Sequence, residues 1–393
     1  MTAETFESGR AFLTPAFRIE LDGRDTGREV ISDVLEVSFT DDLAGVDSFE
    51  FVLHDWDPVA NRPRYSSPWD EQGSPITLYA GGPTVPNFEP GAQVALYLGY
   101  LEDGELPLIM KGEVVSLSPT FPASGAPTCR VRALDAFQRG LQKVRVEGNY
   151  DGTKKEIVER LCAENGVTVE IAGIEDEGES EQNVEVEGVL YDEIESRAKD
   201  YGLFLTTLPA EGGLGDPTLL LAGPAQGGSS PVAEFVWGRT LISFMPALSA
   251  ASQISAVVVR GGDPDAAGDE QSIEVRRTWS DIGLSADALG PAGSADLETA
   301  VRGIEDVIKA PGVATRADAE RAADKHLKEL AQELVTGSGT AIGLPALRTG
   351  ATVSMSGLGA RFDGVYRLTE TTHAIAGAGY TTTFEARKEV LDG

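Results

Sequence analysis

The sequence predicts a mainly β protein of the α+β class. The chain carries 45 glycines and 21 prolines, which favour many turns and short strands over long helices. Its apolar residues mostly alternate with polar ones in short runs, as in strands that bury one face. Because 393 residues exceed what one ordinary core holds, we expect two to four domains.

Residues 1–145 are predicted to form a first β domain. Residues 55–90 within it are rich in Pro, Gly and Trp, and we interpret them as a long ordered loop of the kind that usually serves as a functional or contact surface. Trp56 and Trp69 are candidates to anchor a partner there, although aromatic residues more often pin a loop to its own domain. The predicted strands are Phe17–Leu21, Val34–Phe39, Phe49–Leu53, Val94–Tyr100, Leu108–Val115 and Cys129–Leu134.

Residues 146–235 are predicted to form small α/β modules. Two helix–Gly–strand units lie here, and an acidic stretch, residues 175–187, separates them. That stretch holds too few apolar residues to offset its ordering entropy, so we expect an exposed loop that is mobile in the isolated protein. The first helix is predicted from apolar residues at helical spacing, namely Ile157, Val158, Leu161 and Cys162. The other predicted elements are strand Val167–Ile171, helix Leu190–Tyr201 and strand Leu203–Leu208.

Residues 236–393 are predicted to form a second β domain that contains one long helix. Thr315 is the expected N-cap of this helix, residues 315–336, and Gly337 and Gly339 are expected to end it. Its apolar face is rich in Ala, which indicates close packing against a sheet and no catalytic role. The predicted strands are Trp237–Phe244, Ile254–Arg260, Ser272–Trp279, Ala351–Ser356, Val365–His373 and Tyr380–Glu385.

The composition limits the classes of function. With 63 acidic and 32 basic residues the formal net charge is −31, and such a surface repels phosphate, which disfavours direct nucleic-acid binding. No apolar stretch approaches the ~20 residues that span a bilayer, so no membrane insertion is expected. The start of the sequence has no signal-peptide pattern, and Cys129 and Cys162 make no disulfide framework. We therefore expect synthesis and folding in the cytoplasm; whether the acidity reflects a saline host stays open.

The sequence contains no motif that indicates catalysis or a cofactor. There is no G-x-S-x-G elbow, no phosphate-binding glycine loop and no H-E-x-x-H pair. The three histidines, His54, His326 and His373, are scattered, and we interpret His373 as a structural hydrogen-bonding residue. We therefore predict that the chain is not an enzyme and that it binds no cofactor.

One segment imitates a calcium-binding loop. Asp263, Asp265 and Glu274 occupy positions 1, 3 and 12 of such a loop, with a glycine at position 6. Position 5 is Ala267, however, and the flanking residues are typical of strands rather than helices. These three acids are a weak calcium candidate, and no metal site is predicted.

The C-terminal 51 residues contain glycines, aromatic residues and one arginine at characteristic spacings. This pattern resembles the late control gene D proteins of contractile phages and the hub portion of VgrG-type spikes. The segments Leu241–Leu248 and Val257–Pro264 extend the resemblance, whereas the N-terminal domain is similar only in the order of its elements. The matching positions are Gly343, Pro345, Leu347, Arg348, Gly350, Gly357, Gly359, Phe362, Gly364, Tyr366, His373, Gly379, Tyr380, Thr382 and Phe384.

The resemblance implies an architecture and a mechanical role. Each chain of that family contributes two tube-protein-like β-barrels with small α/β modules between them, and three chains form a pseudo-six-fold ring. The ring is the central hub of a baseplate and adapts the six-fold inner tube to the three-fold spike. Phe362, Tyr366, Tyr380 and Phe384 should then be buried in the last barrel or where barrels meet.

The resemblance also implies partners. They are two further copies of the chain, the inner tube protein, baseplate wedge proteins and a spike. VgrG-type hubs continue into an oligonucleotide-fold domain and a needle, whereas this sequence ends nine residues after Phe384, so we expect a separate spike protein. The folded chain would be incorporated into a tail or an injection particle.

Two other functions are kept as alternatives. A cell-wall hydrolase associated with a tail tip should carry a catalytic constellation, and a host-recognition module should carry repeat-rich distal domains. The sequence contains neither feature. It does not distinguish a phage from an extracellular injection system or a secretion system, and it does not identify the cargo.

Overall fold

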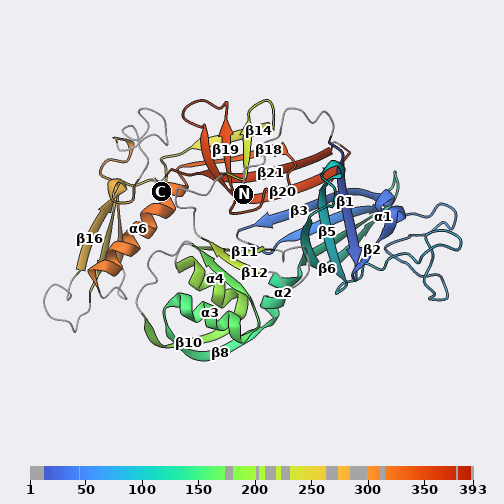
Figure 1. The fold of residues 1–393 in the computed structure, drawn as a ribbon, viewed down its shortest axis with the longest axis horizontal. Coiled ribbons are helices and arrows are strands. Elements are labelled where there is room, and N and C mark those ends of the chain that lie inside the picture. The colour runs from blue at the N-terminus through green and yellow to red at the C-terminus, as the bar shows by residue number, and fades with distance from the viewer. Residues whose placement is uncertain are drawn as a thin grey trace.

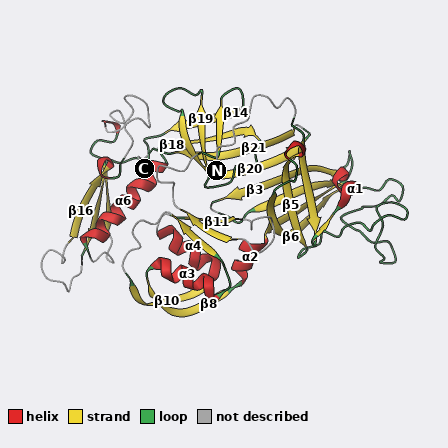
Figure 2. Ribbon diagram, in the orientation of Figure 1, coloured by secondary structure: helices red, strands yellow, loops and turns green. Residues whose placement is uncertain are grey.

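The computed structural model confirms a mainly β chain with a few helices. Figure 2 shows that the longer helices gather beneath the main sheet and at its left end. Within the part of the chain described, no helix is both long and apolar enough to cross a membrane. The structure describes residues 13–43, 45–172, 180–200, 203–208, 218–222, 231–262, 273–283, 299–309, 315–377 and 379–390.

One continuous sheet of thirteen described strands crosses the molecule (Figure 1). Its N-terminal half has the order β3-β4-β7-β6-β5-β1-β2, and every pairing is antiparallel. Alternate residues point inward and form a core with Phe39, Phe49 and Phe51 at its centre. The elements of this half are β1 (Pro15–Leu21), β2 (Arg24–Asp25), α1 (Gly27–Asp33), β3 (Val34–Asp42), β4 (Ser48–His54), β5 (Gln93–Tyr100), η1 (Leu101–Asp103), β6 (Leu108–Thr120) and β7 (Thr128–Asp135).

The C-terminal half of the sheet has the order β14-β18-β21-β20, and β19 and β13 extend it from β20. Its core contains the rings of Phe235, Tyr366 and Phe384, and Phe362 packs against it while partly exposed. The predicted burial of aromatic residues is confirmed for Tyr366, Tyr380 and Phe384. The strands of this half are β13 (Ala233–Val236), β14 (Leu241–Leu248), β18 (Val335–Ile342), β19 (Thr352–Ser356), β20 (Gly364–Ala376) and β21 (Gly379–Lys388).

Strand β20 joins the two halves. Its first residues pair with β19, with Thr352 opposite Arg367, and its later residues pair with β3, from Glu370 opposite Asp42 to Ile375 opposite Val37. Because β20 has 13 residues, about twice the usual strand length, two strands fit end to end along one of its edges. The two predicted barrels are thus two halves of one sheet, and the described strands close no barrel.

An α/β module follows β7 and lies beneath the sheet (Figure 1). Its helix α3 begins with a capping box formed by Thr153 and Glu156 and ends at Glu164. The buried residues of α3 are the four that the sequence predicts. The two-stranded sheet β10-β8 and the three-stranded sheet β11-β12-β9 complete the module. Its elements are α2 (Ala136–Lys143), β8 (Arg145–Gly152), α3 (Lys154–Glu164), β9 (Val169–Ala172), β10 (Glu181–Val189), α4 (Leu190–Asp200), β11 (Phe204–Leu208) and β12 (Thr218–Ala222).

A second small module lies at the left end of the sheet in Figure 1. Helix α6 follows the predicted N-cap Thr315 and buries Ala319, Ala323, Leu327 and Ala331 against β15 and β16. Small alanine side chains let the helix approach the sheet closely. The elements are β15 (Ala256–Gly261), β16 (Ile273–Thr278), η4 (Trp279–Asp281), β17 (Glu305–Lys309) and α6 (Arg316–Gln332).

The acidic stretch predicted as a loop is in large part a strand. Residues 181–187 belong to β10, which pairs antiparallel with β8, and residues 175–179 lie outside the described part of the chain. The side chain of Val186 is buried in the module, whereas Glu185 and Glu187 point to solvent. The acidic side chains therefore lie on the outward face of the strand, and Val184, Val186 and Val189 pack its inward face against the module.

The two glycines expected to end the long helix lie instead in strand β18. Helix α6 ends at Gln332, and the strand begins at Val335. A Cβ atom on Gly337 would lie 2.7 Å from the Phe244 ring, and one on Gly339 would lie 2.6 Å from the Phe384 ring. These glycines thus make room for aromatic rings of the neighbouring strands.

The long loop of residues 55–90 is held by its own domain. The carboxylate of Asp55 accepts hydrogen bonds from the backbone N–H groups of Arg64 (3.0 Å), Tyr65 (2.6 Å) and Ser66 (3.1 Å). Tyr65 and Phe88 are buried in the N-terminal core, and Trp69 is partly exposed. That Trp56 and Trp69 contact a partner stays a prediction.

Candidate functional site at the junction of the two sheet halves

The structure gathers part of the C-terminal pattern at the junction between β20 and β3. The segment between β18 and β19 crosses this junction, so its side chains meet residues of the N-terminal half more than 200 positions away. The pattern residues that meet here are Gly343, Leu347, Arg348, His373, Tyr380 and Thr382.

The other pattern residues lie outside this junction. Tyr366 and Phe384 belong to the C-terminal core, and the Tyr366 hydroxyl donates to the Phe362 carbonyl oxygen at 2.7 Å. Gly357, Gly359 and Gly379 have φ values of 83°, 87° and 107°, in the region that favours glycine. The remaining three are Pro345, half-buried, and Gly350 and Gly364, both with positive φ.

Arg348 is the centre of a largely buried charged cluster. Its guanidinium pairs with Asp41, lies 3.5 Å from Asp47 and donates to the Ile109 carbonyl oxygen at 3.2 Å. The guanidinium also stacks 4.8 Å from the centre of the Phe39 ring. Asp41 and Asp47 are buried, and 22% of the Arg348 side chain is exposed.

Burial and charge shift the two carboxyl groups in opposite directions. Burial tends to raise the pKa of Asp41, but the charge and hydrogen bonds of Arg348 and Thr349 outweigh it and lower that pKa. Burial and the charge of Asp41 together raise the pKa of Asp47 well above its usual value. For Arg348, the nearby carboxylates outweigh burial and raise the pKa.

A second pair of residues connects this cluster to the α/β module. Asp135 caps helix α2, since its carboxylate accepts from the Gln138 backbone N–H at 2.7 Å. The buried Gln138 amide then accepts from the Asp47 backbone N–H at 3.2 Å and donates to the Thr207 hydroxyl at 3.1 Å. Burial raises the pKa of Asp135 to about 6. The junction thus holds both sheet halves and the α/β module together.

His373 is a neutral structural residue, in agreement with its interpretation from the sequence. Its Nε2 lies 2.8 Å from the Leu347 carbonyl oxygen, which only accepts, so Nε2 carries the proton. Its Nδ1 accepts from the hydroxyls of Tyr380 at 2.8 Å and Thr382 at 3.1 Å. Burial lowers the pKa of His373 to about 4. A fully bonded neutral imidazole fixes strand positions and is not free to transfer protons.

Gly343 is required by the same arrangement. A Cβ atom at this position would lie 2.2 Å from the Tyr380 ring, so any side chain collides with it. The Gly343 carbonyl oxygen accepts from the Tyr100 hydroxyl of the N-terminal half at 2.8 Å. Backbone therefore packs directly on an aromatic face at the junction.

The weak calcium candidate stays a prediction that the described residues do not test. Asp263 and Asp265 lie outside the described part of the chain, and Glu274 lies exposed on β16, where it pairs with Arg260 at 2.8 Å. No group of three or more potential metal ligands occurs in the described ranges. Cys129 and Cys162 are buried, and burial raises the pKa of each thiol to about 12, so neither is a reactive thiolate at neutral pH.

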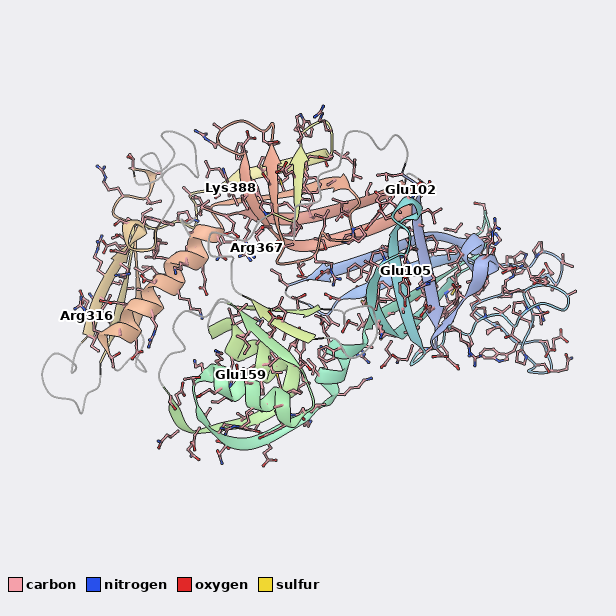
Figure 3. All side chains as sticks on the ribbon, in the orientation of Figure 1. Glu102, Glu105, Glu159, Arg316, Arg367 and Lys388 are labelled. Atoms are coloured by element: carbon pink, nitrogen blue, oxygen red, sulfur yellow. The ribbon has the colours of Figure 1, made fainter. Side chains whose placement is uncertain are left out.

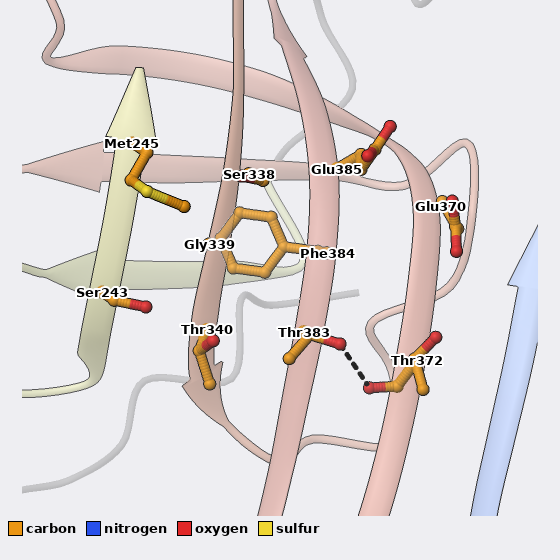
Figure 4. Close-up of a pocket in the computed structure, with 10 residues that line it drawn as sticks. All are labelled: Ser243, Met245, Ser338, Gly339, Thr340, Glu370, Thr372, Thr383, Phe384 and Glu385. Atoms are coloured by element: carbon orange, nitrogen blue, oxygen red, sulfur yellow. Dashed lines mark hydrogen bonds between the residues drawn. The ribbon is translucent and has the colours of Figure 1, made fainter.

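The outer face of the sheet at this junction is polar and open. A shallow groove of about 290 Å³ lies over β14, β18, β21 and β20, and Figure 4 shows the residues that line it. Hydroxyl side chains lie directly opposite one another across six strands and form a row through the groove. The row consists of Ser243, Thr340, Thr383, Thr372, Thr40 and Ser48.

An acidic row runs beside the hydroxyl row. Glu370 lies directly between Glu385 on β21 and Asp42 on β3. Burial and these two like charges raise the pKa of Glu370. Like charges directly opposite in a sheet are destabilising, so this row serves the exposed face rather than the stability of the fold.

Two buried cations lie at the opposite end of the C-terminal half, toward α6 (Figure 3). Arg367 pairs with Glu389 at 2.7 Å, and the Lys388 ammonium donates to the Arg361 carbonyl oxygen at 2.9 Å. Burial lowers the pKa of both side chains. They tie the two long strands to their surroundings.

The sequence analysis missed the acidic half of the junction. A signal for Asp41 was present, because the alternation of Val37 and Phe39 places residue 41 on the buried face of the same strand. A charge at a predicted core position requires a buried partner. Asp47, Asp135 and Gln138 gave no comparable signal, since all three flank turns or helix ends.

Comparison with known proteins places the chain in a family. A family model described as the Alg8 N-terminal domain matches residues 85–377, and the chain therefore belongs to this family. No curated protein matches the sequence. That the chain belongs to the late control gene D family stays a prediction.

The fold is shared with tail proteins of phages and prophages. The 43 kDa tail protein of prophage MuSo2 from Shewanella oneidensis superposes with a TM-score of 0.63 at 14% identity, over 95% of this chain and 98% of that protein. The tail protein from Neisseria meningitidis MC58 gives 0.61 at 14% identity, over 96% and 98%. A type VI secretion component of E. coli, described as similar to the T4 tail proteins gp27 and gp5, gives 0.51 at 12% identity, over 94% and 76%.

Proposed function

We propose that this member of the Alg8 N-terminal domain family is a structural component of a phage tail or a related injection machine, and in particular its central hub. The fold extends over nearly the full length of two tail proteins, which supports a role in such a particle. The observation that carries the proposal is the continuous sheet with one polar, open face. A scaffold that lines a passage needs such a wall, whereas an enzyme needs convergent reactive groups.

Eight strands form the proposed wall, from β14 to β6. All seven pairings between them are antiparallel, so the two terminal strands run in opposite directions. A copy that adds its β14 to the β6 of the next copy would therefore continue the antiparallel alternation. Such a head-to-tail contact closes into a ring when the rotation between copies allows it.

Both ends of the wall are suited to such a contact. Strand β14 exposes Ile242 (52%) and Met245 (70%), and the last residues of β6 pair with β7 alone among the described strands. Phe121 follows this open edge and is 58% exposed. Pro119 and Pro246 each remove one backbone donor, so apolar side chains must carry much of the contact.

The polar face of the wall would line the channel of the ring. The uncharged hydroxyl row offers little attraction to a moving cargo, and the acidic row of Asp42, Glu370 and Glu385 repels polyanions and acidic proteins. The proposed partners are two further copies, the inner tube protein, baseplate wedge proteins and a separate spike. A pull-down of the spike encoded beside this chain tests that last partner.

Assembly across ionic strength tests the ring. Three copies carry a formal charge of 3 × −31 = −93, and the screening length falls from ~30 Å at 0.01 M salt to ~10 Å at 0.1 M. We expect monomers in dilute buffer and trimers near physiological salt by mass photometry. Met245→Asp should abolish the trimer, whereas Val59→Asp, on a side chain of the 55–90 loop that is 95% exposed, should not. A chain that stays monomeric at every salt concentration, with tube and spike proteins supplied, overturns the hub proposal.

A further inference from the structure

The carboxyl groups of Asp41 and Asp47 form a buried acid pair. Asp41 lies on β3 and Asp47 immediately precedes β4, so the two residues flank the connection between these strands. Both are buried, and both pair with the guanidinium of Arg348, Asp47 at 3.5 Å. Two buried carboxyl groups beside a single cation ionise together only at a high cost in free energy, so a proton on one of them is favoured.

Charge counting leads to the same requirement. Asp41, Asp47 and Asp135 lie around one guanidinium, that of Arg348. With all three acids ionised the buried cluster would carry a net charge of −2, which a poorly hydrated site does not tolerate. The other titratable groups near the cluster are His373, which is neutral, and the hydroxyls of Tyr191 and Tyr380.

We propose that Asp41 and Asp47 share one proton, and that this proton makes the junction a pH-sensitive latch on the C-terminal segment. The proton resides on Asp47, because the Asp41 carboxylate already accepts from Arg348 and from the backbone N–H and hydroxyl of Thr349. Loss of the proton to solvent breaks the O–H bond and leaves two facing carboxylates. Their repulsion then weakens the contact that holds segment 343–350 on the N-terminal half. This latch is independent of the hub proposal.

The pattern of shifts agrees with this placement of the proton. The pKa of Asp41 is lowered and that of Asp47 is raised, as in a dyad of carboxyl groups that cannot ionise together. A raised pKa in an acid means that the folded state holds the proton more tightly than the unfolded state. Its stabilising contribution is full below the unfolded pKa of ~3.9 and is lost as pH rises through the folded pKa.

Infrared spectroscopy of the full chain at pH 7 tests the shared proton. We expect the carbonyl stretch of a protonated carboxylic acid in the native protein, its loss in Asp47→Asn, and its retention in the control Asp192→Asn at an exposed position of α4. The band should also vanish in Asp41→Asn, because ionised Asp47 and Asp135 beside Arg348 then give a net charge of −1, the same as the native cluster with its proton. Absence of the band from the native protein, or its persistence in either junction variant, overturns the proposal.

Two further measurements keep the proposal testable if a variant fails to fold. In the native protein, raising the pH should titrate the acid band and at the same time reduce hydrogen-exchange protection of residues 343–350, after correction for the intrinsic rate. Binding of one extra proton in the folded state changes the folding constant tenfold per pH unit. Urea unfolding should show that Asp47→Asn removes this pH dependence of the folding constant. A band that titrates with no change in protection contradicts the latch.

Discussion

The two faces of the sheet at the junction are both polar, but they are polar in different ways. Neighbouring residues on one strand point to opposite sides, so Thr40 and Thr372 face outward while Asp41 and His373 face inward. Each inward group has several fixed partners and is buried. The outward groups include the row of hydroxyls, part of which lines the groove in Figure 4.

This difference indicates which face of the sheet determines how the two halves join and which face determines the properties of the exposed surface. On the inward face, removal of one partner leaves a buried polar group without a hydrogen bond, so each residue is required by its neighbours. Outside, water replaces any lost partner, so single residues matter little and the row acts as a whole. The inward face therefore fixes how the two halves join, and the outward face sets what the wall presents.

Truncation of an inward aromatic should have the largest effect. The Phe384 ring is buried beside Phe235, Phe244 and Gly339. Phe384→Ala removes these contacts and leaves a cavity, so we expect a loss of roughly 3–5 kcal/mol in the free energy of unfolding. Urea denaturation measures it, with the outward neighbour Thr383→Ala as the matched control. A loss below ~1 kcal/mol would contradict the burial of this strand face.

Loss of the central cation should be next in size. Arg348→Ala leaves Asp41 buried without its counter-charge, and we expect a loss of about 3 kcal/mol, at the low end for buried pairs because part of the side chain is exposed. On the outward face, Arg132 lies 3.5 Å from Glu50 and is 49% exposed. Arg132→Ala should cost less than ~1 kcal/mol. Equal losses in the two variants would remove the contrast between the faces.

The helix cap at the junction should make stability depend on pH. Asp135 has a folded pKa of about 6 against an unfolded value near ~3.9, so its stabilising contribution is full below pH ~4 and is lost as pH rises to about 6. The loss amounts to roughly 2–3 kcal/mol for this one group. Asp135→Asn keeps a capping side chain without a charge. The difference between the urea midpoints of the native protein and the variant should grow across this window in favour of Asn; a constant difference would contradict the shift.

The sequence predicted the regular parts of the fold well. Alternation and helical spacing located most strands of the sheet, the N-cap Thr315 and the buried residues of α3, because these signals come from local geometry. The sequence-based prediction failed where contacts with distant segments determine the structure of a residue. Gly337 and Gly339 resemble helix breakers, yet they accommodate rings from other strands, and the valines on its inward face pack the acidic strand β10 against the module.

The candidate site was predictable only in part. The resemblance identified Arg348, His373 and Gly343, but the partners Asp41, Asp47 and Tyr100 come from segments about 240 to 310 positions away. No local pattern encodes such a pairing. The single sheet was not predicted for the same reason. The sequence of β20 indicates one strand, but it does not indicate that this strand pairs with strands of both halves.

The smallest expected effect concerns the hydroxyl row itself. Thr372→Val removes an outward hydroxyl that lies 3.1 Å from the Thr40 hydroxyl, and water can replace that bond. Valine suits a strand as well as threonine does, so we expect a change within ~0.5 kcal/mol in the free energy of unfolding. The matched inward variant is Thr371→Val, where a buried hydroxyl has no hydrogen-bond partner among the described residues. Replacing it by a methyl group removes an unpaired polar atom, so Thr371→Val should stabilise the fold by up to ~1 kcal/mol. Urea unfolding of both variants decides it: a loss above 1 kcal/mol in Thr372→Val would mean that the outer face is packed rather than open, and the wall could not line a passage.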